Sequence, residues 1–297
     1  MSHARIALSQ EMSISEMVGH VFDSTDLKPA TRKTYLRAAK TFTDWASGRP
    51  LDVTILVAYK NHLRDRNELS AKTKNLYLAS TRTVFRQLFA LGVLPFDASK
   101  TVKSFTVSSG HKRPPITDQQ AKHAFDYAAR GGDLRLMLIL NLLFRQGLRQ
   151  KEVVDITVEH FDESSATLAI LGKGRDDREM IHLHPQTVHS LKAFLRERGT
   201  KAGFVFSSRK RCGSHITTNA LYKIVQEVHR ACGISNSPHS WRKVFASKLI
   251  ESGMNLLDVQ AYTRHKSVGQ LKVYFDRISF QKSLPSYYAV FAASDSP

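Results

Sequence analysis

The sequence LRLMLILNLLFRQGLRQKE, residues 134–152, joins a strongly apolar segment to a charged motif. Residues 134–144 are almost wholly apolar, which predicts a helix buried in the core of a domain. This segment is roughly half as long as a helix must be to cross a bilayer. Gly147 ends the predicted helix, and Arg149 and Glu152 follow it closely. A cation and a carboxylate are therefore expected where a buried helix ends.

The sequence around this segment predicts a domain of helices with one hairpin. Thr117 and Gln120 have the spacing of a capping box, so a helix is expected from Thr117 to about Arg130. Residues 166–172 and 179–184 have the composition of two strands, and the charged residues 173–177 between them predict the turn of a hairpin. Further elements are expected at Pro185–Arg198 (a helix), Phe204–Phe206 (a short strand) and from Thr217 onward (helices).

The N-terminal part of the chain predicts a small helical bundle. Its periodicity and its starting residues favour helices at 13–21, 29–45, 51–64 and 70–91. The segment from Pro95 to Pro115 contains three Pro, four Ser and Gly110, so we expect a linker there. We therefore predict a mostly α protein with a helical domain at 1–107 and an α+β domain at 112–297.

Composition favours a folded protein that binds a polyanion. Of the 297 residues, 42% are hydrophobic and 24% charged, which excludes a mostly disordered chain. Forty-four Lys and Arg against 26 Asp and Glu give a net charge of +18 and an isoelectric point near 10.0. Both predicted domains are basic. This charge favours nucleic acid as a partner, with an anionic membrane surface as the second candidate.

Several kinds of site and location are excluded by missing patterns. Cys212 and Cys232 cannot form a disulfide framework and lack zinc-site spacing. His182 and His184 have no third ligand at metal spacing, so we interpret them as structural or surface residues. No P-loop or dinucleotide motif is present, so no nucleotide cofactor is expected. Acidic clusters are also poor, so no two-metal site is expected. The first ten residues lack a signal-peptide core, so we expect a cytoplasmic protein without a membrane anchor.

The remaining polar motifs suit metal-free cleavage of a phosphodiester. That reaction needs cations for the non-bridging oxygens, a nucleophile and a proton donor for the leaving oxygen. Guanidinium suits the first task because its planar fork stays charged and meets a phosphate bidentately. His239 and Arg242 are three residues apart, hence on one face of a helix. His265 precedes Tyr274 by nine residues.

The order of these motifs resembles a known enzyme family. Gly-Leu-Arg-x-x-Glu at 147–152, Gly-Lys-Gly at 172–174 on the hairpin, His-x-x-Arg at 239–242 and the His265–Tyr274 pair occur in the order typical of tyrosine recombinases, the phage-integrase and Xer-type DNA strand-transfer enzymes. The resemblance covers residues 112–280 by motif and 10–95 only by architecture. It implies a helical core-binding domain followed by an α+β catalytic domain with a small antiparallel sheet.

The resemblance also implies a role for each motif residue. Tyr274 would attack the scissile phosphate and form a 3′-phosphotyrosyl link, while Arg149 and Arg242 hold the non-bridging oxygens. His265 would donate a further hydrogen bond, and Lys173 would protonate the departing 5′ oxygen. His239 would assist proton transfer at the tyrosine, and Glu152 would support the site.

Further expectations concern DNA and assembly. Two basic helix faces are predicted, which are either solvated or contact the DNA backbone; the first consists of Lys33, Arg37 and Lys40, the second of Lys72, Asn75, Arg82 and Arg86. The family acts as a tetramer on two DNA sites, and residues 279–293 are similar to its terminal helix, which docks on a neighbouring subunit; the alternative is a helix packed on its own domain. The resemblance favours a prokaryotic, phage or mobile-element origin.

Departures from the family pattern leave alternatives open. Trp241 and Lys243 flank the second arginine, and Thr263 and Arg264 replace the Leu-Gly usual before the third-motif histidine. Arg264 is either a DNA contact or a solvated side chain. The rival functions are a type IB topoisomerase, a telomere resolvase and a non-catalytic DNA-binding regulator of the same fold.

Overall fold

The computed structural model describes residues 12–107, 116–172, 177–199, 201–208 and 213–271. The chain divides into two compact units, residues 1–109 and 110–297. None of the helices in these ranges is long and apolar enough to cross a membrane.

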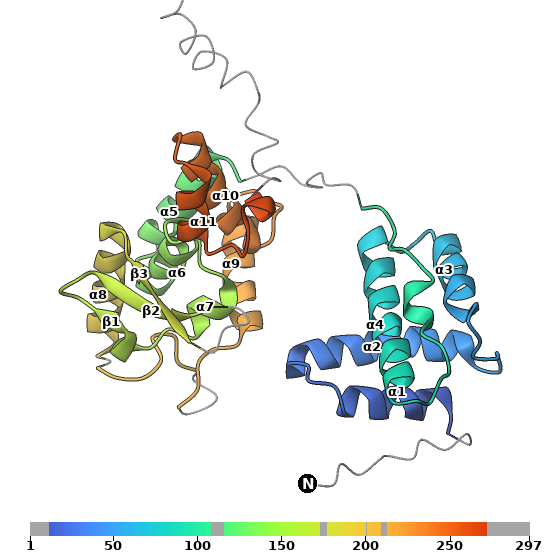
Figure 1. Ribbon diagram of the computed structural model, residues 1–297. Coiled ribbons are helices and arrows are strands. Elements are labelled where there is room, and N and C mark those ends of the chain that lie inside the picture. The colour runs from blue at the N-terminus through green and yellow to red at the C-terminus, as the bar shows by residue number, and fades with distance from the viewer. Residues whose placement is uncertain (1–11, 108–115, 173–176, 200, 209–212, 272–297) are drawn as a thin grey trace, which may run out of the picture. The chain divides into compact units, whose positions relative to one another are not determined.

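Unit 1 is a bundle of helices, as the sequence predicts (Figure 1). Helix α4 packs against α1, α2 and α3 and against the short helix η1. The predicted helix at 51–64 begins later, because Asp52 accepts hydrogen bonds from the backbone and hydroxyl of Thr54 and so forms a local turn. The helices are α1 (Ile14–Asp23), α2 (Pro29–Ala46), α3 (Ile55–Asp65), α4 (Ala71–Ala90) and η1 (Ala98–Lys100).

Unit 2 is mostly helical and contains one small antiparallel sheet, in the order β1-β2-β3. The predicted fold class is thus confirmed. The elements are α5 (Asp118–Arg130), α6 (Leu134–Phe144), α7 (Gln150–Val154), η2 (Val158–His160), β1 (Phe161–Asp162), β2 (Thr167–Leu171), β3 (Arg178–His182), α8 (Pro185–Arg198), α9 (Thr218–Ala231), α10 (His239–Glu251), α11 (Leu256–Thr263) and η3 (Val268–Leu271).

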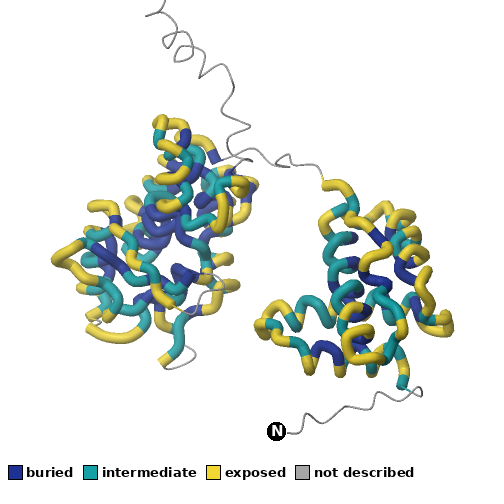
Figure 2. Tube along the Cα trace, in the orientation of Figure 1, coloured by how far each residue is buried: buried dark blue, intermediate teal, exposed yellow. Residues whose placement is uncertain are grey.

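Helix α6 forms the centre of unit 2. It packs against α5, α7, α8 and α10, and its middle residues are buried on every side (Figures 1 and 2). A helix that is apolar all round needs such an environment to remove its surface from water. Because α6 is fixed by packing on all sides, the residues that directly follow it are held in a defined position.

Two predicted β elements have different outcomes. Strands β2 and β3 pair from Thr167 opposite His182 to Leu171 opposite Arg178, so the predicted hairpin is confirmed, while Lys173 in its turn lies outside the described residues. The predicted strand Phe204–Phe206 is wrong. Phe204 makes an isolated bridge with Thr157, but Val205 and Phe206 lie in a turn, so no ladder of paired residues forms.

Candidate active site

The turn after α6 places Arg149. Gly147 has a φ of +57°, which lets the chain reverse so that the Leu148 amide donates to the Leu142 carbonyl at 3.1 Å. A side chain would not fit at Gly147, because a Cβ atom there would lie 2.3 Å from Cδ1 of Phe245. Arg149 then becomes the N-cap residue of α7.

Glu152 fixes both ends of Arg149. Its carboxylate accepts hydrogen bonds from the Arg149 backbone amide at 2.8 Å and from Nη1 at 2.6 Å. The Glu152 residue is 2% exposed. Burial raises the pKa of Glu152, but the charge of Arg264 and the hydrogen bonds from Arg149 outweigh burial, so the pKa lies below its ordinary value. The carboxylate is therefore ionised at neutral pH and orients the arginine.

Arg242 joins three segments of unit 2. It lies on the first turn of α10, is 1% exposed, and donates from Nη1 to the Gly147 carbonyl at 2.5 Å. Its Nη2 donates to the carbonyl of Thr263 at the end of α11. Because two backbone carbonyls fix the guanidinium, its orientation does not depend on a bound ligand. His239 is the first residue of the same helix, three positions earlier.

His265 is held just after α11. Its backbone amide donates to the Gln260 carbonyl at 3.2 Å, and the Gln260 amide group donates back to the His265 carbonyl at 3.1 Å. Burial lowers the pKa of His265 to about 4, and the positive charges of Arg242 and Arg149 add to that effect. In the DNA-free protein the imidazole is therefore neutral at pH 7.

The tautomer of His265 follows from Thr263. The Thr263 hydroxyl oxygen lies 2.6 Å from the Val259 carbonyl, which can only accept, and 2.6 Å from His265 Nδ1. The single hydroxyl proton is therefore directed to the carbonyl, so the oxygen accepts a hydrogen bond from the protonated Nδ1. In the neutral ring Nε2 is then the basic nitrogen, and it becomes a donor only when the ring is protonated.

The side chain of Arg264 is buried, so the alternative that it is solvated is wrong. Its side chain is 4% exposed, and its Nη2 lies 3.1 Å from Glu152 Oε2 in a salt bridge. Its carbonyl also accepts a long hydrogen bond, of 3.4 Å, from Arg149 Nη2. The guanidinium turns inward because a buried carboxylate requires a cation nearby.

The structure thus brings together Arg149, Arg242 and His265, residues that are far apart in the sequence. His239 also lies close enough for its charge to lower the pKa of His265. Lys173 and Tyr274 lie outside the described residues. Cations and an imidazole therefore converge at the ends of three helical segments, and the ionised Glu152 carboxylate holds one of these cations in place.

Comparison with known proteins agrees with this arrangement. The profile of the Phage integrase family matches residues 114–279. The chain belongs to this family of tyrosine recombinases. Tyrosine recombinase XerC of Leptospira interrogans is 23% identical over 240 residues, which cover 76% of this chain and 73% of the relative. Tyrosine recombinase XerD of Mycobacterium tuberculosis is 28% identical over 227 residues, 69% of this chain and 70% of the relative.

A solved structure shares the recombinase fold. The integrase of transposon Tn1549, in complex with transposon right-end DNA, superposes with a TM-score of 0.72 at 15% identity, covering 94% of this chain and 99% of that chain.

A hydrogen-bonded group that the sequence analysis missed supports the start of α10 in this recombinase. Trp241 Nε1 donates to Nε2 of the buried His229 at 2.8 Å. Nε2 must then be the acceptor, so His229 Nδ1 carries the proton and donates to the Asn236 carbonyl at 2.8 Å. Burial lowers the pKa of His229, which keeps the ring neutral. The only sequence signal was the departure at Trp241.

The predicted DNA-contact residues of unit 1 differ in their surroundings. Lys33, Arg37, Lys72 and Arg86 are exposed, and Lys40 is exposed but paired with Asp44 at 2.8 Å. On the second face, Arg82 donates to the Ser104 hydroxyl at 3.2 Å. Asn75 exchanges two hydrogen bonds, of 2.9 and 2.7 Å, with the backbone of Phe105. Part of the α4 face therefore holds Ser104 and Phe105, which lie inside the segment predicted to be a linker.

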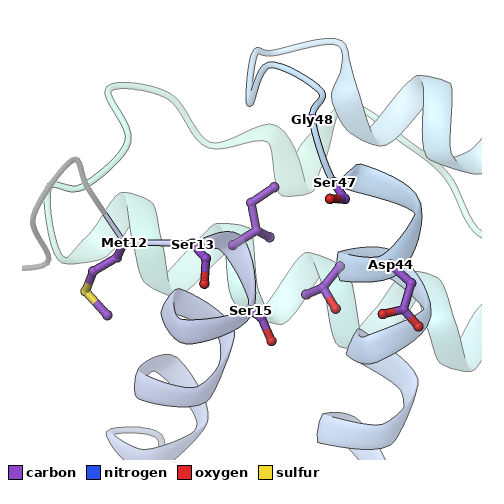
Figure 3. Close-up of a pocket in the computed structure, with 8 residues that line it drawn as sticks. Met12, Ser13, Ser15, Asp44, Ser47 and Gly48 are labelled. Carbon is purple, nitrogen blue, oxygen red and sulfur yellow. The ribbon is translucent and has the colours of Figure 1, made fainter.

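One other hollow, in unit 1, lacks the groups that a phosphate would need. Figure 3 shows a hollow between the start of α1 and the end of α2, whose lining includes Ser13, Asp44 and Ser47 and no Lys or Arg. A phosphate would meet a carboxylate there and no cation. Within the described ranges, no three His, Cys, Asp or Glu side chains are grouped closely enough to hold a metal ion. His184 instead caps α8, where its Nδ1 accepts from the Gln186 amide at 3.1 Å.

Proposed function

We propose that this protein is a site-specific recombinase that cleaves and rejoins double-stranded DNA through a 3′-phosphotyrosyl intermediate at Tyr274, without a metal or nucleotide cofactor. The observation that carries the proposal is the convergence of Arg149, Arg242 and His265 in unit 2. Tyr274 follows His265 by nine residues in the sequence. Membership in the phage integrase family supports the same reaction.

The arginines stabilise the charge that develops on the phosphate. Arg242 is fixed by two carbonyls, so its guanidinium is oriented before DNA arrives and loses little entropy on binding. Arg149 is 25% exposed at its side chain, which leaves it accessible to an incoming phosphate. The two guanidinium groups together bind the non-bridging oxygens of the pentacoordinate transition state.

Proton transfer is divided among three groups in this proposal. Lys173, between two glycines on the hairpin turn, protonates the departing 5′ oxygen. His239 assists removal of the tyrosine proton. His265 is neutral in the DNA-free protein, and an approaching phosphate raises its pKa because a negative charge favours the imidazolium. Once protonated, His265 donates from Nε2 to a non-bridging oxygen.

Both units take part in DNA binding in this proposal. The exposed cations of unit 1, Lys33, Arg37, Lys72 and Arg86, contact the backbone, which positions the protein without reading sequence. The active assembly is a tetramer on two DNA sites, with residues 279–293 docking on a neighbouring subunit. The protein acts on DNA in the cytoplasm of a prokaryote or from a phage or mobile element.

The test is a covalent trap. Duplexes that bind the protein are selected from a random library, a nick is placed near the cleavage position so that the cleaved strand diffuses away, and products are separated after denaturation. Wild-type protein should form an adduct, Tyr274→Phe should form none, and Tyr262→Phe should behave as wild type. Retention of DNA binding by a wild-type protein that forms no adduct would leave only a non-catalytic DNA-binding regulator.

A further inference from the structure

Arg264 occupies an unusual backbone position. Its φ of +53° lies in the left-handed region, where the Cβ atom of an ordinary residue crowds the following carbonyl oxygen. The residue is the C-cap of α11, a position at which glycine is usual. An arginine that keeps this conformation must be compensated by what its side chain does.

The side chain of Arg264 reaches a buried carboxylate. Nη2 lies 3.1 Å from Glu152 Oε2, and Nη1 donates to the Tyr262 carbonyl at 3.0 Å. The other carboxylate oxygen of Glu152, Oε1, accepts from Arg149 Nη1 at 2.6 Å. One buried carboxylate is therefore shared between a guanidinium that faces the site and one that is enclosed.

We infer that Arg264 is a positioning residue that keeps Glu152 neutralised, so that Arg149 can turn its guanidinium toward a phosphate. Without Arg264, Arg149 would be the main counter-charge of a side chain that is 1% exposed. An uncompensated carboxylate at that depth is costly, so Arg149 would stay bound to it. With Arg264 present, Glu152 retains one guanidinium when the other engages DNA. This inference rests on the proposed function, because it assigns Arg149 to the phosphate.

The charge of Arg264 also reaches His265. The charged groups that face the imidazole are Arg242 and His239 from α10, Arg149 at the start of α7, and Arg264 itself. All of them disfavour a proton on the ring. Removing the Arg264 guanidinium should therefore raise the pKa of His265 in the DNA-free protein, an effect that a purely architectural residue would not produce.

The experiment compares two changes at Arg264 with a control change elsewhere in unit 2. Arg264→Gly removes the guanidinium and at the same time relieves the left-handed backbone, so a defect cannot come from strain. Single-turnover cleavage of the nicked duplex should slow by at least about tenfold while the Kd for DNA changes by less than about twofold. Arg264→Lys should keep most of the rate, since it preserves the charge. Arg196→Gln, a change at an exposed arginine on α8, is the matched control and should cleave as wild type.

The decisive variant is the double change Arg264→Gly with Glu152→Gln. An uncharged amide in place of the buried carboxylate would need no counter-charge, so the double variant should cleave faster than Arg264→Gly alone. Histidine NMR on the DNA-free protein should show the pKa of His265 raised in Arg264→Gly. Wild-type rates in Arg264→Gly, or no recovery in the double variant, would overturn the positioning role. If wild-type protein forms no adduct, the proposed function itself fails, and the two failures are thereby distinguished.

Discussion

Replacing Gly147 with alanine should destabilise unit 2 for two separable reasons. The residue has a φ of +57°, where an L side chain costs about 1–2 kcal/mol. The new Cβ would also lie 2.3 Å from Phe245 Cδ1, and such overpacking costs about 1–3 kcal/mol. Together these contributions reduce the free energy of unfolding by about 2–5 kcal/mol. Because the Gly147 carbonyl binds Arg242, DNA cleavage should also fall.

The control is Gly199→Ala. Gly199 has a φ of +62° but nothing within 4 Å of its Cβ position, so this change carries the backbone cost alone, about 1–2 kcal/mol. Urea unfolding is followed by the fluorescence of Trp241 in a Trp45→Phe background, since these are the chain's two tryptophans. In a Phe245→Ala background, Gly147→Ala should reduce the free energy of unfolding by less than it does in the wild-type protein, because the ring that the new Cβ would meet is gone. Equal losses of unfolding free energy in Gly147→Ala and Gly199→Ala would refute the steric argument.

Three further predictions concern proton transfer and packing. Lys173→Ala should slow cleavage of an ordinary substrate by about 10²–10⁴-fold, but it should cleave a substrate with a 5′-thiolate leaving group almost as well as wild type. Arg242→Ala should stay defective with both substrates. If the thiolate substrate does not restore cleavage by Lys173→Ala, His239 becomes the next candidate for the general acid. The pKa of His265, about 4 in the folded protein against an ordinary 6.5, means that the unfolded chain binds more protons between those values. Stability should therefore fall as pH drops through that window, and a smaller fall in His265→Gln, measured by urea unfolding, would support the assignment. Trp241→Phe should cost about 1–3 kcal/mol in thermal unfolding, because it leaves the buried His229 without its donor; an unchanged midpoint would contradict that network.

The sequence was most informative where local patterns and burial agree. Helices α6 and α8 have the bounds that were expected, because one is an almost wholly apolar run and the other begins at Pro185 and ends before a glycine. The hairpin followed from two β-type runs around a charged turn. The three-residue strand at Phe204–Phe206 failed because nothing local shows whether a partner strand exists.

Part of the site could not be predicted because it depends on contacts between distant residues. Arg264 and Glu152 are 112 positions apart, so their pairing is set by how α7 and α11 end, which no local pattern shows. The same holds for Thr263, whose carbonyl binds Arg242 and whose hydroxyl fixes the tautomer of His265. Motif order predicted the groups that are proposed to meet the phosphate, but the groups that orient them required the structure.

The most direct test of the central proposal is to locate the covalent bond to DNA. The adduct is digested with nuclease and trypsin, and the peptide that carries a nucleotide is sequenced by mass spectrometry. Cleavage after Lys272 and Arg277 gives a five-residue peptide in which Tyr274 is the only tyrosine, whereas Tyr262 lies in the separate peptide 249–264. The proposal predicts that the first peptide carries a nucleotide joined to Tyr274 through its 3′ phosphate. A nucleotide on Tyr262 or on any other residue would contradict it.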